Sequence, residues 1–123
     1  MNSTIAESAL ALTLDIGRYR IRIHRSTLQQ MGNPDYFRLL VNPQEKGIVL
    51  EGCSEKCAGA FPAIRKDDRK HSMEVYCPAL VSEISKCAGF QRYRSVKLLG
   101  RQICGQHAVF FRLVPADACL YSL

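Results

Sequence analysis

The segment GRYRIRIHRS, residues 17–26, carries arginine at alternate positions and offers a row of groups that bind anions. In a β-strand successive side chains point to opposite faces, so this segment predicts one basic and one apolar face. The basic face would carry Arg18, Arg20, Arg22 and His24, and the apolar face Tyr19, Ile21 and Ile23. Each guanidinium can donate two N–H groups to an anionic oxygen, so the row indicates contacts with phosphate. The alternative is a solvated strand face, or an edge protected against pairing with another chain.

The six cysteines are the next residues that could do chemistry: Cys53, Cys57, Cys77, Cys87, Cys104 and Cys119. They would suit a disulfide framework in a secreted chain, but no feature of the sequence indicates secretion, so we expect reduced thiols in a cytoplasmic protein. Cys53 and Cys57 have the spacing of a zinc ligand pair. A structural zinc site needs four ligands, and only His71 and Cys77 are left to complete one. We expect no metal and no other cofactor.

No motif for catalysis surrounds the remaining reactive residues. The cysteines lack the sequence context of a nucleophile, and the three histidines His24, His71 and His107 lack that of a catalytic base. Gly100 and Gly105 lack the following Lys-Ser/Thr pair of a phosphate loop. The sequence therefore predicts a protein that is not an enzyme.

The composition of the chain indicates its size class and the kind of partner that the arginine row would meet. The chain has 123 residues, of which 47% are hydrophobic, enough for one ordinary domain or two very small domains that depend on each other. A net charge of +6 and a pI near 9.2 favour an anionic partner such as nucleic acid. No stretch approaches the roughly eighteen apolar residues of a membrane span, so we expect no contact with a membrane.

Two hairpins are expected in the first half of the chain. Large apolar residues occupy every second position of residues 9–16, which predicts a strand, with a short helix as the alternative. Gly17 would take a positive φ in the turn to the arginine-bearing strand. A short helix follows, with Ser26 as its N-cap, Leu28 and Met31 on its buried face, and Gly32 at its end. Residues 36–42 and 47–52 predict the second hairpin.

The second half repeats this order of elements. Residues 72–77 predict a strand, Pro78 begins a helix to residue 89, and two strands follow at 93–100 and 108–114. Phe110 and Phe111 are adjacent and must point to opposite faces, which favours a second layer or a subunit interface. We expect units at 1–55 and 72–123, joined by a connector at 56–71, that share one core.

Residues 10–53 resemble the SpoVT/AbrB family of swapped-hairpin DNA-binding domains, and the tandem order resembles its MraZ branch. Asp15, Gly17 and Arg18 correspond to the family's Asp-x-x-Gly-Arg turn, Ile23 to its Ile-Pro, and Met31 with Gly32 to its Leu-Gly. The chain differs in having His24 for the proline and Gln29 with Gln30 for a basic pair on the helix.

The resemblance implies an α+β fold, mostly of short β-strands, in which two AbrB-like β-α-β-β swapped-hairpin units form a small barrel and the protein is a homodimer. It also implies a transcriptional regulator that presents arginines to double-stranded DNA. The residues expected to contact DNA are Arg18, Arg20, Arg22, His24, Arg25, Gln29 and Gln30. The alternative is a non-enzymatic protein-interaction or structural member of the same fold, whose arginine row meets an acidic partner protein or water.

Overall fold

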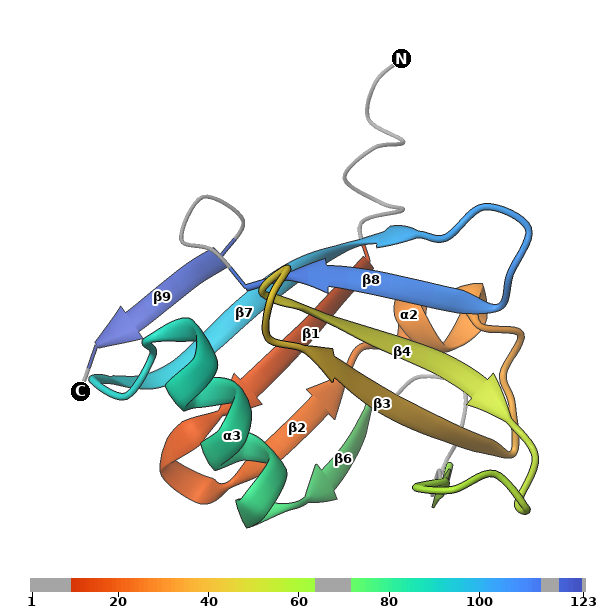
Figure 1. The fold of residues 1–123 in the computed structure, drawn as a ribbon, viewed down its shortest axis with the longest axis horizontal. Coiled ribbons are helices and arrows are strands. Elements are labelled where there is room, and N and C mark those ends of the chain that lie inside the picture. Colours follow the sequence, from red (N-terminus) through yellow and green to blue (C-terminus); the bar gives the residue numbers. More distant parts are fainter. Residues whose placement is uncertain (1–9, 64–71, 114–117, 123) are drawn as a thin grey trace.

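The computed structural model describes residues 10–63, 72–113 and 118–122. These residues form a small α+β fold, in which one sheet of antiparallel strands curls into a half-barrel with the two helices α2 and α3 against it (Figure 1). The strand order is β5-β3-β4-β8-β7-β1-β2-β6, and β9 pairs with β7. The predicted α+β class with mostly short strands is confirmed.

The first hairpin joins β1 (Leu10–Asp15) to β2 (Arg20–Ile23) through the 3-10 turn η1 (Ile16–Arg18). The Asp15 carboxylate caps this turn by accepting a hydrogen bond from the Arg18 backbone N–H at 3.2 Å. Tyr19, and not Gly17, then takes the positive φ, 58°. The predicted conformation of Gly17 is therefore wrong, as is the placing of Tyr19 beside Ile21: Tyr19 is 46% exposed, whereas Ile21 is buried.

Helix α2 (Arg25–Gln30) follows β2 directly and buries Leu28 and Met31, as predicted. Ser26 is not its N-cap, because the helix already begins at Arg25 and His24 occupies the cap position. Gly32, with a φ of 86°, ends the helix as predicted. Its N–H donates to the Gln29 carbonyl, and the next N–H donates to the Leu28 carbonyl, which satisfies the last carbonyls of the helix.

Thr27 connects α2 to strand β1 through two hydrogen bonds. Its buried hydroxyl accepts a hydrogen bond from the Ala11 N–H at 2.9 Å and donates one to the Ala11 carbonyl at 2.8 Å. One side chain thus satisfies both backbone groups of a residue in β1, which fixes α2 at one end of the first hairpin.

The second hairpin is formed by β3 (Tyr36–Asn42) and β4 (Gly47–Cys53), at the predicted residues. The expected connector contains a short strand, β5 (Phe61–Pro62), that pairs with β3 and that the sequence pattern did not indicate. The Phe61 ring stacks on Phe37 with the ring centroids 5.6 Å apart, and this contact explains why the segment joins the sheet. Residues 64–71 of the connector, His71 included, lie outside the described residues.

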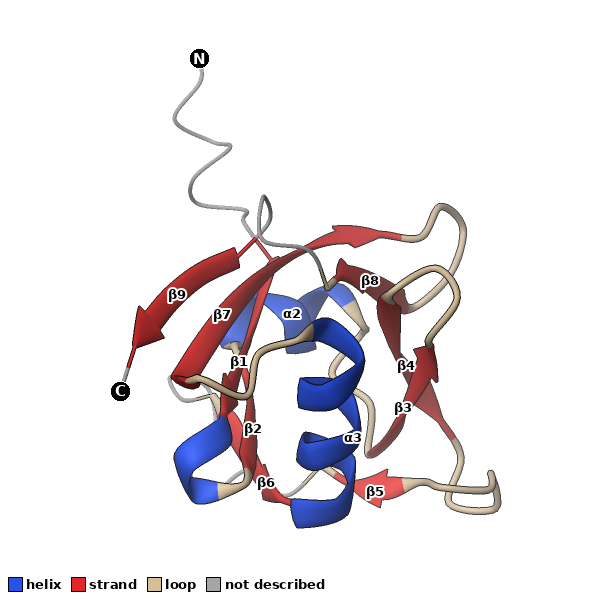
Figure 2. Cartoon of the chain, turned by 60° about the vertical axis from the view of Figure 1, so that its left-hand side comes forward, coloured by secondary structure: helices blue, strands red, loops and turns tan. Residues whose placement is uncertain are grey.

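The second half supplies β6 (Met73–Tyr76), α3 (Pro78–Ala88), β7 (Tyr93–Gln102), β8 (Ala108–Arg112) and β9 (Ala118–Ser122). Pro78 begins α3 as predicted, and β9 is an additional strand that the sequence pattern did not indicate. Figure 2 shows α3 between β1 and β2 on one side and β3 and β4 on the other.

Equivalent strands of the two halves pair with each other. The order strand, helix, strand, strand occurs as β2-α2-β3-β4 and again as β6-α3-β7-β8, and β2 pairs with β6 while β4 pairs with β8. Buried side chains from both halves, such as Phe37 and Leu50 from the first and Leu98 and Phe111 from the second, belong to one apolar cluster. Both halves therefore contribute side chains to one core.

Phe110 and Phe111 point to opposite faces of β8, as predicted. Phe111 is fully buried in the core, whereas Phe110 is half-buried on the outer face and covers Gly47 of β4. A Cβ atom at Gly47 would lie only 2.2 Å from the Phe110 ring, so glycine there leaves room for the ring.

Candidate nucleic-acid interface

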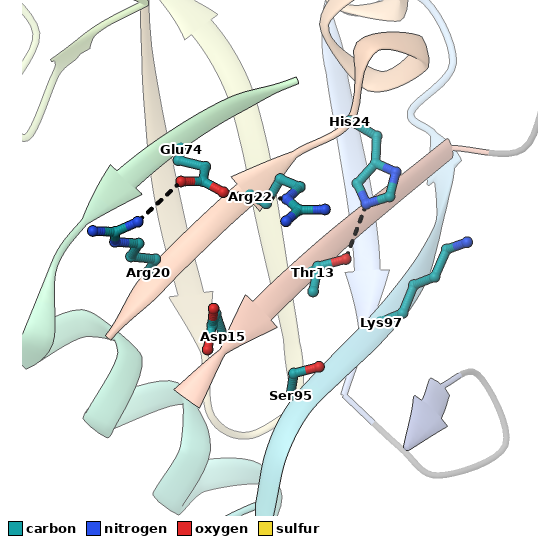
Figure 3. Close-up of a pocket in the computed structure, with 8 residues that line it drawn as sticks. All are labelled: Thr13, Asp15, Arg20, Arg22, His24, Glu74, Ser95 and Lys97. Carbon is teal, nitrogen blue, oxygen red and sulfur yellow. Dashed lines mark hydrogen bonds and ion pairs between the residues drawn. The ribbon is translucent and has the colours of Figure 1, made fainter. Parts of the chain in front are cut away.

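Eight side chains gather on the outer face of the sheet formed by β6, β2, β1 and β7, and we call this surface the polar face. They line a hollow of about 280 Å³ (Figure 3): Thr13, Asp15, Arg20, Arg22, His24, Glu74, Ser95 and Lys97. The hollow is open to solvent and accessible to a ligand.

Strand register determines the shape of the hollow. One row across the sheet runs from Lys97 through Thr13 and Arg22 to Glu74. Short side chains on the central strand β1 therefore form the floor, and long charged side chains on β2 and β7 stand on either side. Arg20 and Arg22 are two positions apart on β2 and so project from the same face, about 7 Å apart along the strand.

Both arginines of β2 share the carboxylate of Glu74. Arg20 Nη1 lies 3.3 Å from Glu74 Oε1, and Arg22 Nε lies 3.4 Å from Glu74 Oε2. The arginine side chains are 45% and 49% exposed, and ion pairs of such exposure contribute only about 0–1 kcal/mol. The guanidinium groups can therefore exchange Glu74 for another anion at little cost.

The charge of the polar face is only slightly positive. Among the lining residues, Arg20, Arg22 and Lys97 are opposed by Asp15 and Glu74, an excess of one positive charge with His24 neutral. The Asp15 carboxylate is already partly engaged in the η1 turn, because it accepts a hydrogen bond from the Arg18 backbone N–H. A phosphate that displaced Glu74 would meet two guanidinium groups and an ammonium group.

His24 contributes a hydrogen bond to the polar face. Its Nε2 lies 2.9 Å from the Thr13 hydroxyl oxygen. Burial lowers the pKa of His24 below its ordinary value, and the positive charges of Lys97 and Arg22 lower it further. At neutral pH the ring is therefore uncharged and adds no positive charge.

The structure brings together three of the predicted DNA-contacting residues, Arg20, Arg22 and His24. It separates the other four from the hollow. Arg18 lies in the exposed η1 turn and Arg25 begins α2, so the predicted continuous row is interrupted at both ends. Gln29 is exposed and Gln30 half-buried on α2, a helix that contacts β1 and β8.

Sequence reasoning missed five members of the polar face: Thr13, Asp15, Glu74, Ser95 and Lys97 were not proposed as site residues. A local signal exists for the last two, because Ser95 and Lys97 alternate with the buried Val96 and Leu98. That alternation indicates an outward position but does not indicate that β7 lies beside β1.

No family model, curated protein or solved structure matches this chain. The polar face and the order of the elements are therefore the observations from which function is inferred. No helix in the described ranges is long and apolar enough to cross a membrane. Within those same ranges, no three His, Cys, Asp or Glu side chains gather as a metal site would require.

Proposed function

We propose that this protein is a DNA-binding transcriptional regulator of the AbrB-like type, which contacts duplex phosphates through the polar face. The observation that supports this proposal most directly is that Arg20, Arg22 and Lys97 line one hollow that is open to solvent. Arginine and lysine contacts to phosphate position a protein on DNA without reading its sequence, so the contacts we propose are to the backbone. The protein would act in the cytoplasm and without enzymatic activity.

The tandem AbrB-like arrangement is part of this proposal. It is supported by the repeated order strand, helix, strand, strand and by the pairing of β2 with β6 and of β4 with β8. A homodimer would bring two polar faces to one duplex. Three phosphate contacts on one face correspond to a salt slope of about −3, and two faces to about −5.

Glu74 has a defined role in this proposal, because it occupies the two guanidinium groups in the free protein. Binding to DNA would replace its carboxylate with phosphate oxygens. Glu74 therefore lowers the affinity and disfavours weak, non-specific contacts.

The proposal is tested by measuring the binding of a short fluorescent duplex by anisotropy over a series of salt concentrations. The double variant Arg20→Gln/Arg22→Gln should weaken binding by about tenfold or more and reduce the salt slope by about one for each residue. Glu74→Gln should strengthen binding several-fold, because it removes a carboxylate that competes with phosphate.

The matched control is Lys46→Gln/Lys56→Gln, which removes the same charge from exposed residues in the β3–β4 loop and in the turn after β4. It should lower affinity much less than the arginine pair. The proposal is wrong if the duplex does not bind at low salt or if the two double variants weaken binding equally. Absence of duplex binding would leave an acidic protein as the partner of the arginines.

A further inference from the structure

A second reactive cluster lies away from the polar face, in the turn after β4. The strand ends at Cys53, and the Cys57 N–H donates to the Ser54 carbonyl at 3.1 Å, which closes a tight turn. The Lys56 N–H donates to the Ser54 hydroxyl oxygen at 3.3 Å within the same turn. Cys53 and Cys57 are both partly exposed.

Cys53 and Cys57 lie at the two ends of this closed turn, four residues apart. The Ser54 hydroxyl lies 3.9 Å from the Cys57 sulfur. A disulfide requires Cα atoms within about 7 Å of each other, and a tight turn brings residues near its two ends into that range. The turn holds the pair without any rearrangement of the sheet.

Residues of the second hairpin anchor the turn. Tyr36 is the cross-strand partner of Cys53, and interaction with the Glu55 carboxylate of the turn raises the pKa of Tyr36 above its ordinary value. Two pairs further along the hairpin, Arg38 on β3 forms an ion pair with Glu51 on β4. These contacts connect the turn to the second hairpin.

The electrostatic environment distinguishes the two thiols. Hydrogen bonds from the backbone and hydroxyl of Ser54 lower the pKa of Cys57, and the Arg38 charge lowers it further. Burial and the hydrogen bond to Cys57 raise the pKa of Cys53. The thiolate, and not the thiol, attacks a disulfide, so Cys57 is the nucleophile and Cys53 the second thiol.

We propose that Cys53 and Cys57 are a dithiol site that reacts with low-molecular-weight disulfides and closes to a reversible internal disulfide. This site is independent of the DNA-binding proposal, because it lies on β4 and the following turn and shares no residue with the polar face.

The reaction with oxidised glutathione proceeds in two exchanges. The Cys57 thiolate attacks one sulfur of the glutathione disulfide, forms a mixed disulfide and releases one glutathione thiolate, which takes up a proton. Cys53 then loses its proton to solvent and attacks the Cys57 sulfur, which releases the second glutathione. The two protein thiols are oxidised, and one glutathione disulfide is reduced to two glutathione thiols.

The test exposes the full chain to buffers of oxidised and reduced glutathione, quenches with acid, alkylates free thiols and maps the digest by mass spectrometry. The wild type should gain an internal Cys53–Cys57 disulfide, which reduced glutathione reverses. Cys53→Ser should accumulate a glutathione adduct on Cys57, because no second thiol remains to displace it. Cys57→Ser should form neither product, and adding Ser54→Ala to Cys53→Ser should slow adduct formation several-fold at neutral pH.

Cys104→Ser is the matched control, because Cys104 is exposed and lies between β7 and β8. It should leave the reaction of Cys53 and Cys57 unchanged. The proposal is overturned if the disulfide joins two protein chains or another pair of cysteines. It is equally overturned if Cys53→Ser reacts no faster at Cys57 than at Cys104. Far-UV circular dichroism verifies that each variant is folded.

Discussion

His24 lies where β2 passes into α2, and its ring bonds Thr13 instead of pairing with a carboxylate. Lys97 on β7 and Arg22 on β2 face the ring, and with burial they disfavour its protonated form. A histidine in the middle of a basic segment is thus neutral in the folded protein, although its sequence neighbours suggest a further positive charge. The residue supports the hairpin and orients Thr13 on the floor of the hollow.

His24 gives a prediction for the pH dependence of stability. Its pKa is lower in the folded protein than the value of about 6.5 in the unfolded chain, so the unfolded state binds more protons as the pH falls. The free energy of unfolding should therefore decrease as the pH drops below about 6.5. Urea titrations at about pH 7.5 and about pH 5 would measure this decrease.

The comparison variants for this titration are His24→Gln and His107→Gln. Replacing His24 should make the loss of stability smaller, because glutamine can bond Thr13 but does not titrate. His107 is exposed, and its replacement should preserve the full decrease seen in the wild type. Equal pH dependence in the wild type and His24→Gln would refute the assignment.

Gly100 in β7 shows that packing inside a strand can require the smallest residue. It pairs with Phe111 on one side and Leu10 on the other. A Cβ atom there would lie 2.6 Å from Cε2 of Phe111 and 2.7 Å from Cγ1 of Val109. Both of these side chains are fully buried, so neither can move aside easily.

Gly100→Ala should therefore reduce the free energy of unfolding by about 1–3 kcal/mol, measured by urea denaturation. Gly17→Ala is the matched control in the η1 turn, where Gly17 has no positive φ and a Cβ would meet Arg94 Cγ at an ordinary 3.4 Å. That change should alter stability by less than about 1 kcal/mol and can be stabilising. A similar effect of both substitutions would contradict the packing argument.

The shared core determines how the molecule unfolds. Pairing of β2 with β6 and of β4 with β8 joins the halves, and their buried side chains form one cluster. Each half is too small to bury its apolar surface alone, so loss of either half should expose the other.

We therefore expect one cooperative transition, with the same midpoint by far-UV circular dichroism and by tyrosine fluorescence. Leu50→Ala in β4 and Leu98→Ala in β7 should each lower that midpoint for both probes, at a cost of about 2–5 kcal/mol. Both residues are fully buried. Separate transitions, or a variant that moves only one probe, would show that the halves fold independently.

Local chemistry in the sequence was enough to predict most of the elements. Strand-forming residues predicted β3 and β4, proline predicted the start of α3, and Gly32 predicted the end of α2, because each signal acts within a few residues. The same reasoning failed at Gly17, because the Asp15 carboxylate tightened the turn and moved the positive φ to Tyr19.

Only the tertiary structure decided which side chains form the polar face. Alternation correctly placed Arg20 and Arg22 outward, but Glu74 lies 54 and 52 residues away from them in the sequence. Lys97 reaches the hollow because β7 pairs with β1. The choice of a strand's neighbours depends on burying apolar faces from distant segments together, and the pattern along a single strand does not contain that information.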